Sequence, residues 1–455
     1  MERGMNHKEV KKMNSHDAYI TARDFYRSGK TRPLLYRKKQ LFALLKGIDA
    51  FRGAIDVALK ADLNKSSREA FLTEIYLTKE EIRHMIRHMG SYGRTARPLP
   101  GVAQLPGTLA VRREPYGTVL VISPWNYPFQ LSLLPVVGAI AAGNAVVVKP
   151  SEYAPETGKA LKALCESVLD EGLVSFVFGE EEAAKALLAE PFDKVFFTGN
   201  GDVGRSVMKQ AAAHPAPTTL ELGGKSPVIV DETADIPMAA KRIAFGKTMN
   251  AGQTCVAPDT VYVHVSRKEA LIDGLLDAFE EAFPTEDYFI GETVRMNHAG
   301  RYERMKALAE EGDLRTKHPR IFYDDSLHVF PCVVENPRGR LLDEEIFGPL
   351  LPVAAYESEE VLFAELREKD KPLALYLFSE DEAFIRRALR AVDSGGACVN
   401  DTLLHLASNK APFGGVGPSG MGAYHGKWSY DTFSRPRTVL KKSLRFDISL
   451  RYHPF

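Results

Sequence analysis

One cysteine of this chain has neighbours that suit a reactive thiol. Cys255 follows the small and polar residues "NAGQT", which leave its sulfur approachable. A thiolate is a soft nucleophile that can attack a carbonyl carbon and then carry the acyl group as a thioester. An arbitrary cysteine is more often a packing residue. The interpretation of Cys255 as a nucleophile therefore depends on the motifs that accompany it.

The other three cysteines have apolar surroundings. Cys165 lies in the helical run "LKALCESVL", whereas Cys332 and Cys398 lie in the strand-like runs "FPCVV" and "GACVN". We expect all three to be buried and inert. The four cysteines are far apart and form no CxxC pair, which argues against a disulfide framework or structural zinc and favours a reducing, cytosolic setting. No set of metal ligands is recognisable, so no metal is expected.

Glu221 has surroundings that suit acid–base chemistry. It lies between Leu220 and Leu222 at the end of an apolar strand, directly before a pair of glycines. Partial burial disfavours a charged carboxylate, so we expect its pKa to be raised toward the range useful for activating water. The alternative is an ordinary surface carboxylate at a strand end.

Two glycine-rich stretches resemble nucleotide-binding motifs. Gly199 to Gly204 spell "GNGDVG", a GxGxxG match, after the predicted strand "KVFFT". In the familiar dinucleotide-binding fingerprint the motif follows the first strand of the fold, and an acidic residue about 20 positions later binds the ribose. Here the motif follows the fourth predicted strand. We therefore do not expect Glu221, which lies at nearly that distance, to bind ribose. The glycines are still expected to open a helix N-terminus to a phosphate. "GGKS" is not a P-loop, because the required earlier glycine is Thr219.

Several motifs occur in a fixed order along the chain. They are "SPWNYP" (123–128), "KPSE" (149–152), "LELGGKSP" (220–227), "NAGQTC" (250–255), "DEEIFGP" (343–349) and "PFGGVGPSG" (412–420). In this order and spacing they resemble the NAD(P)-dependent aldehyde dehydrogenase superfamily over almost the whole chain. The short N-terminus and the ending "GGVGPSGMGAYHGKWSYDTFS" are similar to its class 3 branch.

The resemblance implies oxidation of aldehydes to carboxylic acids with NAD(P)+ through a cysteine thiohemiacetal and a thioester. Cys255 would be the nucleophile, Glu221 the general base, and Asn126 a donor to the oxyanion together with the Cys255 backbone N–H. A turn-forming role for Asn126 is the alternative. A CoA-acylating aldehyde dehydrogenase is a rival that Glu221 disfavours, because activated water is useful only for hydrolysis. A catalytically silent protein on the same fold is a second rival, which the joint presence of the three residues disfavours.

The resemblance also implies a cofactor site, formed by Trp125, Lys149, Glu152, Gly199, Gly204, Glu345 and Phe347. Lys149 and Glu152 would lie at the adenosine ribose, the glycine motif at the pyrophosphate, and Glu345 and Phe347 at the nicotinamide end. Lys149 could accept a 2′-phosphate, but Glu152 would repel it, so we expect NAD with NADP tolerated. Gly201 stands where the family usually has a larger residue, which could alter the grip on the cofactor.

The elements that must position these residues indicate an α/β fold. Amphipathic helices over about 18–89 precede the runs "GTVLVISP", "NAVVVKPS", "VSFVFG" and "KVFFTG", which alternate with helical stretches as in a doubly wound nucleotide-binding domain. A second α/β series begins near Thr218. We expect an NAD(P)-binding domain over 1–217, a catalytic domain over 218–410, and a return segment with a strand-like oligomerisation tail over 411–455.

The composition of the chain argues against some classes of binding partner. The chain has 59 basic and 59 acidic residues, so no net field favours nucleic acid or an anionic membrane. The N-terminus has no signal-peptide pattern. The apolar segment 131–148 contains Pro135, Gly138 and Gly143, so a buried helix and strand are favoured over a membrane span. The class 3 likeness implies a cytoplasmic homodimer acting on medium-chain aliphatic or aromatic aldehydes, and residues 401–409 are expected at the substrate mouth.

Overall fold

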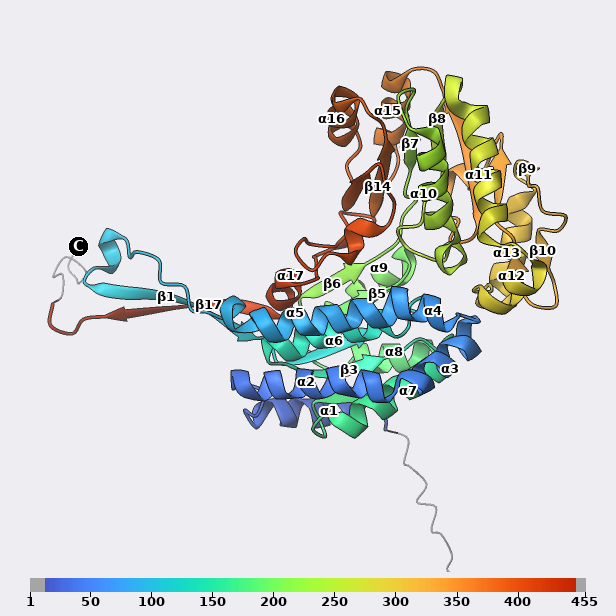
Figure 1. Cartoon of the computed structure of the whole chain (residues 1–455). Coiled ribbons are helices and arrows are strands. Elements are labelled where there is room, and N and C mark those ends of the chain that lie inside the picture. Colours follow the sequence, from blue (N-terminus) through green and yellow to red (C-terminus); the bar gives the residue numbers. More distant parts are fainter. Residues whose placement is uncertain (1–12, 447–455) are drawn as a thin grey trace, which may run out of the picture.

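Two sheets in two adjoining lobes form the body of the protein (Figure 1). The structure, a computed structural model, describes residues 13–446. A narrow arm of two strands projects from the lobe that contains the N-terminal helices (Figure 1). The α/β class predicted from the sequence is confirmed.

The first sheet has the order β16-β6-β5-β2-β3-β4. Its strands are parallel except for the antiparallel pair β16–β6. They are β2 (Thr118–Ile122), β3 (Ala145–Lys149), β4 (Val174–Phe176), β5 (Lys194–Thr198), β6 (Thr218–Glu221) and β16 (Gly420–Met421). The chain runs outward from β2 to β4 and then returns to the other side of β2 with β5. In doubly wound sheets ligands bind at the carboxyl ends of the strands beside such a reversal.

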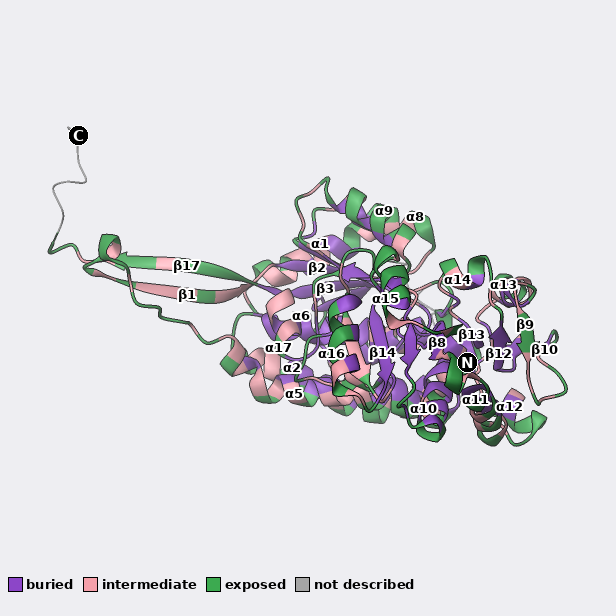
Figure 2. Ribbon diagram, turned by 90° about the horizontal axis from the view of Figure 1, so that it is seen from above, coloured by how far each residue is buried: buried purple, intermediate pink, exposed green. Residues whose placement is uncertain are grey.

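Helices cover both faces of this sheet. On one face Leu120, Val147 and Phe197 pack with α1 (Ser15–Arg27), α8 (Glu181–Leu188) and α9 (Gly201–Ala211). The other face packs against α2 (Leu34–Ala50), α5 (Tyr76–Tyr92), α6 (Gln130–Ala142) and α7 (Pro155–Val168). Figure 2 shows the strands buried between helices whose outer sides are exposed. Burial on both faces explains why these strands read as continuous apolar runs.

The apolar segment 131–148 forms a helix and a strand, as predicted. Helix α6 ends at Gly143, whose φ of 101° lies in the left-handed region that favours glycine, and β3 follows directly. In the part of the chain that the structure describes, no helix has the length and apolar character needed to cross a membrane.

The second sheet has the order β15-β14-β7-β8-β13-β12-β9, and only β9 is antiparallel to its neighbour. Its strands are β7 (Val228–Val230), β8 (Val261–His264), β9 (Asp313–Arg315), β12 (Cys332–Glu335), β13 (Leu350–Tyr356), β14 (Ala374–Phe378) and β15 (Gly396–Val399). The central strands pack against α10 (Ile236–Thr248) and α11 (Lys268–Ala282) on one face, and against α15 (Glu359–Glu368) and α16 (Glu382–Ala391) on the other.

The chain passes from the first sheet to the second slightly after the domain boundary predicted at 217/218. Strand β6, which begins at Thr218, pairs with β5 and belongs to the first sheet, whereas β7 belongs to the second. The chain therefore crosses between the sheets after Glu221, through the two glycines that follow it. This crossing leaves Glu221 at the junction of the two lobes.

Short elements complete the lobes. α3 (Arg52–Leu63), α4 (Ser67–Ala70) and a π-helical turn, η1 (Phe71–Ile75), connect α2 to α5. Beside the second sheet lie α12 (Glu286–Glu292), α13 (Ala299–Ala309), α14 (Arg340–Asp343) and the strand pair β10 (Phe322–Tyr323) and β11 (His328–Val329). Short 3-10 turns span Val102–Gln104, Met249–Gly252, Val265–Arg267 and Leu404–Ala407.

The arm consists of β1 (Gly107–Pro115) and β17 (Ser434–Lys442), which pair antiparallel from Gly107 with Lys442 to Pro115 with Ser434. The tail is therefore strand-like over β17, but its first part forms the helix α17 (Lys427–Thr432), which packs on α5 and α6. Residues 447–455 of the predicted tail lie outside the described residues.

Candidate active site

One cavity of about 970 Å³ lies at the carboxyl edge of the first sheet, where the lobes meet. Residues that follow β2, β3, β5 and β6 line it, as the strand-order reversal between β2 and β5 requires. It brings together nine of the ten predicted site residues: Trp125, Asn126, Lys149, Glu152, Gly199, Glu221, Cys255, Glu345 and Phe347.

The tenth predicted residue, Gly204, is not among those that line this cavity. It is buried in α9, and a Cβ there would lie 2.6 Å from a methyl carbon of Leu222, so glycine allows α9 to pack against the end of β6. Asn200 caps the same helix, because its side chain accepts a hydrogen bond of 2.9 Å from the Val203 N–H. Gly201 has no such constraint, since the nearest atom to an added Cβ is Arg205 Nη1 at 3.4 Å.

Cys255 lies in a loop that leaves α10 through an unusual turn. Asn250 and Ala251 have φ values of 54° and 52°, in the left-handed region. Burial, together with nearby Glu345 and Glu221, raises the pKa of the Cys255 thiol to about 12, against an opposing effect of the Cys255 and Val256 backbone N–H groups. In the free protein the thiol is therefore protonated at neutral pH, and it needs a base to become a nucleophile.

Glu221 ends β6 and is only 2% exposed. Burial raises the pKa of its carboxyl well above the ordinary range. Neither carboxyl oxygen has a hydrogen-bond partner among the described residues. A buried carboxyl without partners, facing a cavity, has the properties of a group that accepts a proton from a bound water.

Asn126 is buried directly beyond β2. Its Nδ2 donates to the Gln253 carbonyl oxygen at 3.0 Å, which ties the Asn126 turn to the Cys255 loop. An amide nitrogen carries two hydrogens, so one N–H remains for another acceptor. Asn126 and Cys255 both line the cavity, as the predicted oxyanion-donor role requires.

Lys149 and Glu152 form an ion pair at the end of β3. Lys149 Nζ lies 2.6 Å from a carboxylate oxygen of Glu152, with side-chain exposures of 5% and 34%. Both residues line the cavity. A ligand that reaches them therefore meets a paired lysine and a partly exposed carboxylate.

Glu345 and Phe347 line the cavity from the segment between α14 and β13. Phe347 has a φ of 50°, and its ring meets the Trp125 ring edge-on at a centroid distance of 5.7 Å. Burial raises the pKa of Glu345 to about 8. Arg304 fixes this turn by donating to the Ile346 carbonyl at 2.7 Å and the Glu345 carbonyl at 2.9 Å.

Several residues that build this site were not apparent from the sequence. The Arg301 guanidinium lies over the rings of Trp125 and Phe347, at 4.6 and 5.3 Å from their centroids. Lys65 and Glu74, from the N-terminal segment, contact the Asn126 turn. Their spacing in "KSSREAFLTE" matches an ordinary helix surface, so no pattern distinguished them.

The expectation for the remaining cysteines holds for two of the three. Cys165 and Cys332 are buried, and burial raises the pKa of each thiol to about 12. The prediction was wrong for Cys398, which is half-buried, with its sulfur 3.3 Å from His405 Nδ1. Cys398 lies in β15, which is at the edge of its sheet, so no neighbouring strand pairs with β15 on one side.

The cavity fits a dinucleotide. The N-terminus of α9 opens into it between Gly199 and Val203, where backbone N–H groups suit a phosphate. Lys149, Glu152, Glu345 and Phe347 line the same cavity. Among residues 13–446 no group of three or more His, Cys, Asp or Glu side chains could hold a metal ion. A doubly wound sheet with a cavity of this kind at its carboxyl edge is typical of a nucleotide-dependent enzyme.

Comparison with known proteins identifies the family. The model of the aldehyde dehydrogenase family matches residues 4–439, and the chain belongs to this family. It is an NAD(P)-dependent enzyme that oxidises aldehydes to carboxylic acids.

Its relatives include class 3 enzymes. The chain is 40% identical to the 4,4′-diaponeurosporen-aldehyde dehydrogenase of Staphylococcus aureus, over 96% of each chain. It is 38% identical to a rat aldehyde dehydrogenase described as dimeric and NADP-preferring, over 94% of each chain. The structure of substrate-bound Staphylococcus aureus AldH superposes with a TM-score of 0.93 and 39% identity, over 97% of each chain.

The raised thiol pKa predicts how Cys255 reacts in the free protein. Below the pKa the thiolate fraction rises about tenfold per pH unit, so alkylation by iodoacetamide should accelerate about a hundredfold between pH 7 and pH 9, with no plateau. Peptide mass spectrometry separates Cys255 from Cys398, and a Cys255→Ala variant serves as control. A plateau below pH 8 would show that the thiol is already activated without a ligand.

Proposed function

We propose that aldehyde oxidation proceeds through a thioester on Cys255, with Asn126 as oxyanion donor and Glu221 as the base for water. The observation that carries the proposal is one cavity lined by an approachable thiol, a buried amide and a buried carboxyl without partners. Among the described residues, Cys255 carries the only thiol that lines this cavity, and Glu221 is the lining carboxyl whose two oxygens both lack a hydrogen-bond partner.

In the first half of the reaction the Cys255 thiol gives its proton to a neighbouring base, its sulfur bonds to the aldehyde carbon, and the carbonyl oxygen becomes an oxyanion in a thiohemiacetal. The free N–H of the Asn126 amide and the Cys255 backbone N–H donate to this oxygen, and loss of one such donor typically costs about 3 kcal/mol. The carbon–hydrogen bond of the former aldehyde then breaks, the hydride leaves to the acceptor, and the oxygen re-forms a carbonyl, which gives the thioester. The nicotinamide ring of NAD(P) supplies the hydride acceptor. Residues that line the cavity, among them Lys149, Glu152, Glu345 and Phe347, would hold it.

In the second half the thioester is hydrolysed. Glu221 takes a proton from a water molecule as its oxygen bonds to the acyl carbon, and the carbon–sulfur bond then breaks to release the carboxylic acid and the Cys255 thiolate. Glu221 works only when ionised. Because burial raises its pKa, deacylation should slow as the pH falls below that raised value.

The class 3 relationship suggests medium-chain aliphatic or aromatic aldehydes as substrates. Aromatic rings support this choice: Phe413 meets Tyr424 at a centroid distance of 5.9 Å, and His405 lies 6.0 Å from Tyr376. Burial raises the pKa of the Tyr376 and Tyr424 phenols, and the nearby Cys255 sulfur adds to the effect. Apolar rings close to the nucleophile favour an apolar aldehyde, with residues 401–409 at its entrance.

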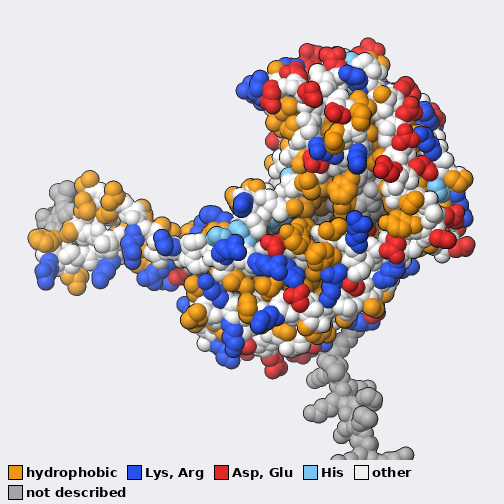
Figure 3. Space-filling model, in the orientation of Figure 1, with side chains coloured by type: hydrophobic (Ala, Val, Ile, Leu, Met, Phe, Trp, Pro, Cys, Tyr) orange, Lys and Arg blue, Asp and Glu red, His pale blue; other side chains and the backbone are white. Residues whose placement is uncertain are grey.

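We further propose a cytoplasmic homodimer in which the arm contacts the partner. A two-stranded ribbon is marginally stable by itself in water, yet this one carries exposed apolar side chains, including Leu440 and Leu444, at 44% and 102% exposure. Figure 3 shows hydrophobic side chains at the tip of the arm and basic ones along it. A cytoplasmic setting agrees with the four free cysteines.

Glu221→Gln tests the mechanism. The amide cannot accept the proton, so steady-state NADH production should fall about a hundredfold, after a first burst close to one NADH per site. Intact-protein mass spectrometry should show the acyl adduct. Cys255→Ala is the control and should give neither burst nor adduct. An unchanged steady-state rate in Glu221→Gln would remove Glu221 from the mechanism.

Glu152→Gln tests cofactor choice. The change removes a carboxylate that would repel a 2′-phosphate and frees Lys149 from its ion pair, so the ratio of kcat/KM for NADP over NAD should rise about tenfold, equivalent to about 1.4 kcal/mol. Glu156→Gln is a matched control, because Lys159 and Glu156 form a pair of the same length and spacing outside the cavity. Equal ratios in both variants would place Glu152 away from the ribose.

Ending the chain after Ser434 tests the arm. This deletion removes the rest of β17 but keeps Phe433, which is fully buried against the body. Light scattering should change from the mass of two chains to that of one. The variant Leu440→Asp/Leu444→Asp keeps the chain length and should give the same result. A dimer that survives both changes would exclude the arm as its interface.

A further inference from the structure

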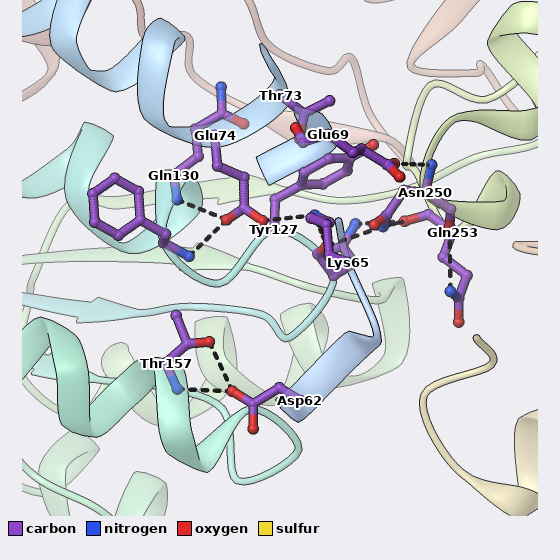
Figure 4. Close-up of polar contacts among 12 residues, drawn as sticks. Asp62, Lys65, Glu69, Thr73, Glu74, Tyr127, Gln130, Thr157, Asn250 and Gln253 are labelled. Atoms are coloured by element: carbon purple, nitrogen blue, oxygen red, sulfur yellow. Dashed lines mark hydrogen bonds and ion pairs between the residues drawn. The ribbon is translucent and has the colours of Figure 1, made fainter. Parts of the chain in front are cut away.

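The N-terminal segment 62–75 runs past both loops of the active site, although it holds none of the motif residues. Figure 4 shows Lys65 beside Tyr127, Glu69 pointing toward Asn250, and Glu74 pointing toward Gln130. The segment joins α3 to α5 through α4 and the π-helical turn η1. Its side chains are thus placed to act on the turn that carries Asn126 and on the loop that carries Cys255.

A buried ion pair makes hydrogen bonds to both ends of the turn 126–130. Lys65 Nζ lies 2.6 Å from Glu74 Oε1, and both side chains are fully buried. At the start of the turn, Lys65 Nζ donates to the Asn126 carbonyl oxygen at 3.5 Å and lies 4.3 Å from the centre of the Tyr127 ring. At its end, Glu74 Oε2 accepts from the backbone N–H of Phe129 at 2.8 Å and of Gln130 at 3.2 Å.

The same segment holds the nucleophile loop. Glu69 Oε1 accepts a hydrogen bond of 2.7 Å from the Asn250 backbone N–H, at the first of the two left-handed residues. Asn250 Nδ2 in turn donates to the Asn126 carbonyl oxygen at 2.9 Å and to the Gln253 carbonyl oxygen at 3.0 Å. The Asn126 carbonyl is therefore held from both sides, by Lys65 and by Asn250.

Stability does not account for such a pair. Removing two charges from water costs about as much as their attraction returns, and apolar replacements are often as stable. Catalysis has a stricter requirement, because a displacement of about 1 Å in a reacting group can cost a hundredfold in rate. One Asn126 N–H already donates to Gln253, so the direction of the second is set by the position of the turn.

We infer that Lys65 and Glu74 are positioning residues for the oxyanion donor Asn126. The pair fixes the turn 126–130 so that the free N–H of the Asn126 amide points to the oxygen of the thiohemiacetal on Cys255. This role rests on the proposed function, in which Asn126 is the oxyanion donor. Neither side chain of the pair lines the cavity, so they act through the turn and not on the substrate.

A double-mutant cycle with Asn126 tests the role. Lys65→Met keeps the length of the side chain without its charge, and it should lower kcat/KM for an aldehyde about thirtyfold, within the range for a displaced catalytic group. In an Asn126→Ala background the same change should cost less than about twofold, because the donor it positions is already absent. Thermal unfolding should shift equally in both backgrounds. Equal losses of kcat/KM in both backgrounds would overturn the inference.

Two further variants keep the test decisive. Lys65→Met/Glu74→Gln removes both charges together, so no lone charge is stranded in the interior, and it should show the same dependence on Asn126 if the single variant fails to fold. Lys194→Met is the control for loss of a buried lysine: Lys194 donates to Thr219 Oγ1 at 2.7 Å, and no contact with either loop is seen among the described residues. It should leave kcat/KM within about twofold.

Failure of the inference is distinguishable from failure of the proposed function. Aldehyde-dependent NADH production by the unaltered protein, and its loss in Asn126→Ala, test the function first. NAD affinity, measured by quenching of tryptophan fluorescence, should be the same in Lys65→Met as in the unaltered protein. A loss of NAD affinity equal to the loss of kcat/KM would assign the pair to the general fold of the site and overturn the inference.

Discussion

The hydrogen bond from the Asn126 side chain to the Gln253 carbonyl joins the two sheets at the point where the chemistry takes place. Asn126 follows β2 of the first sheet, and Gln253 lies in the loop between α10 of the second lobe and β8 of its sheet. A thiol and its oxyanion donor must be held at a fixed separation. Because they come from different lobes, the geometry of the site depends on how rigidly the lobes are joined, and the buried polar network around residue 126 supplies that rigidity.

Burial favours the catalytic role of one group in this site and opposes that of another. The apolar surroundings that raise the pKa of Glu221 make its carboxylate a stronger base toward water. The same surroundings raise the pKa of Cys255 to about 12, which opposes formation of the attacking thiolate. The two groups need opposite shifts. A single low-dielectric cavity cannot provide both, so proton transfer from the thiol must be coupled to ligand binding or to a neighbouring base.

Much of the fold and most of the site could be predicted from the sequence, because each motif follows a buried parallel strand. Strands such as "NAVVVK" are recognisable by their apolar runs, and the carboxyl ends of parallel strands meet at one edge, which brought Lys149, Glu221 and Gly199 together. Cys398 was misjudged, because an apolar run does not distinguish an edge strand from a central one. Lys65 and Glu74 were missed, since charges at helical spacing normally face water, and only the tertiary packing shows that these two are enclosed.

The pairing of β1 with β17 has a consequence for synthesis of the chain. Gly107 pairs with Lys442, and Glu221 in β6 pairs with Gly420 in β16, so both contacts join a segment to one that is synthesised much later. Phe433, which is fully buried and packs against α6 at Gly138, also arrives late. The nucleotide-binding lobe therefore cannot complete its core during translation, unlike domains that fold as contiguous units. Until residues 420–442 have been synthesised, the nascent chain lacks the partners of β6 and of the α6 face at Gly138, and exposed edges and apolar faces of this kind are prone to aggregation.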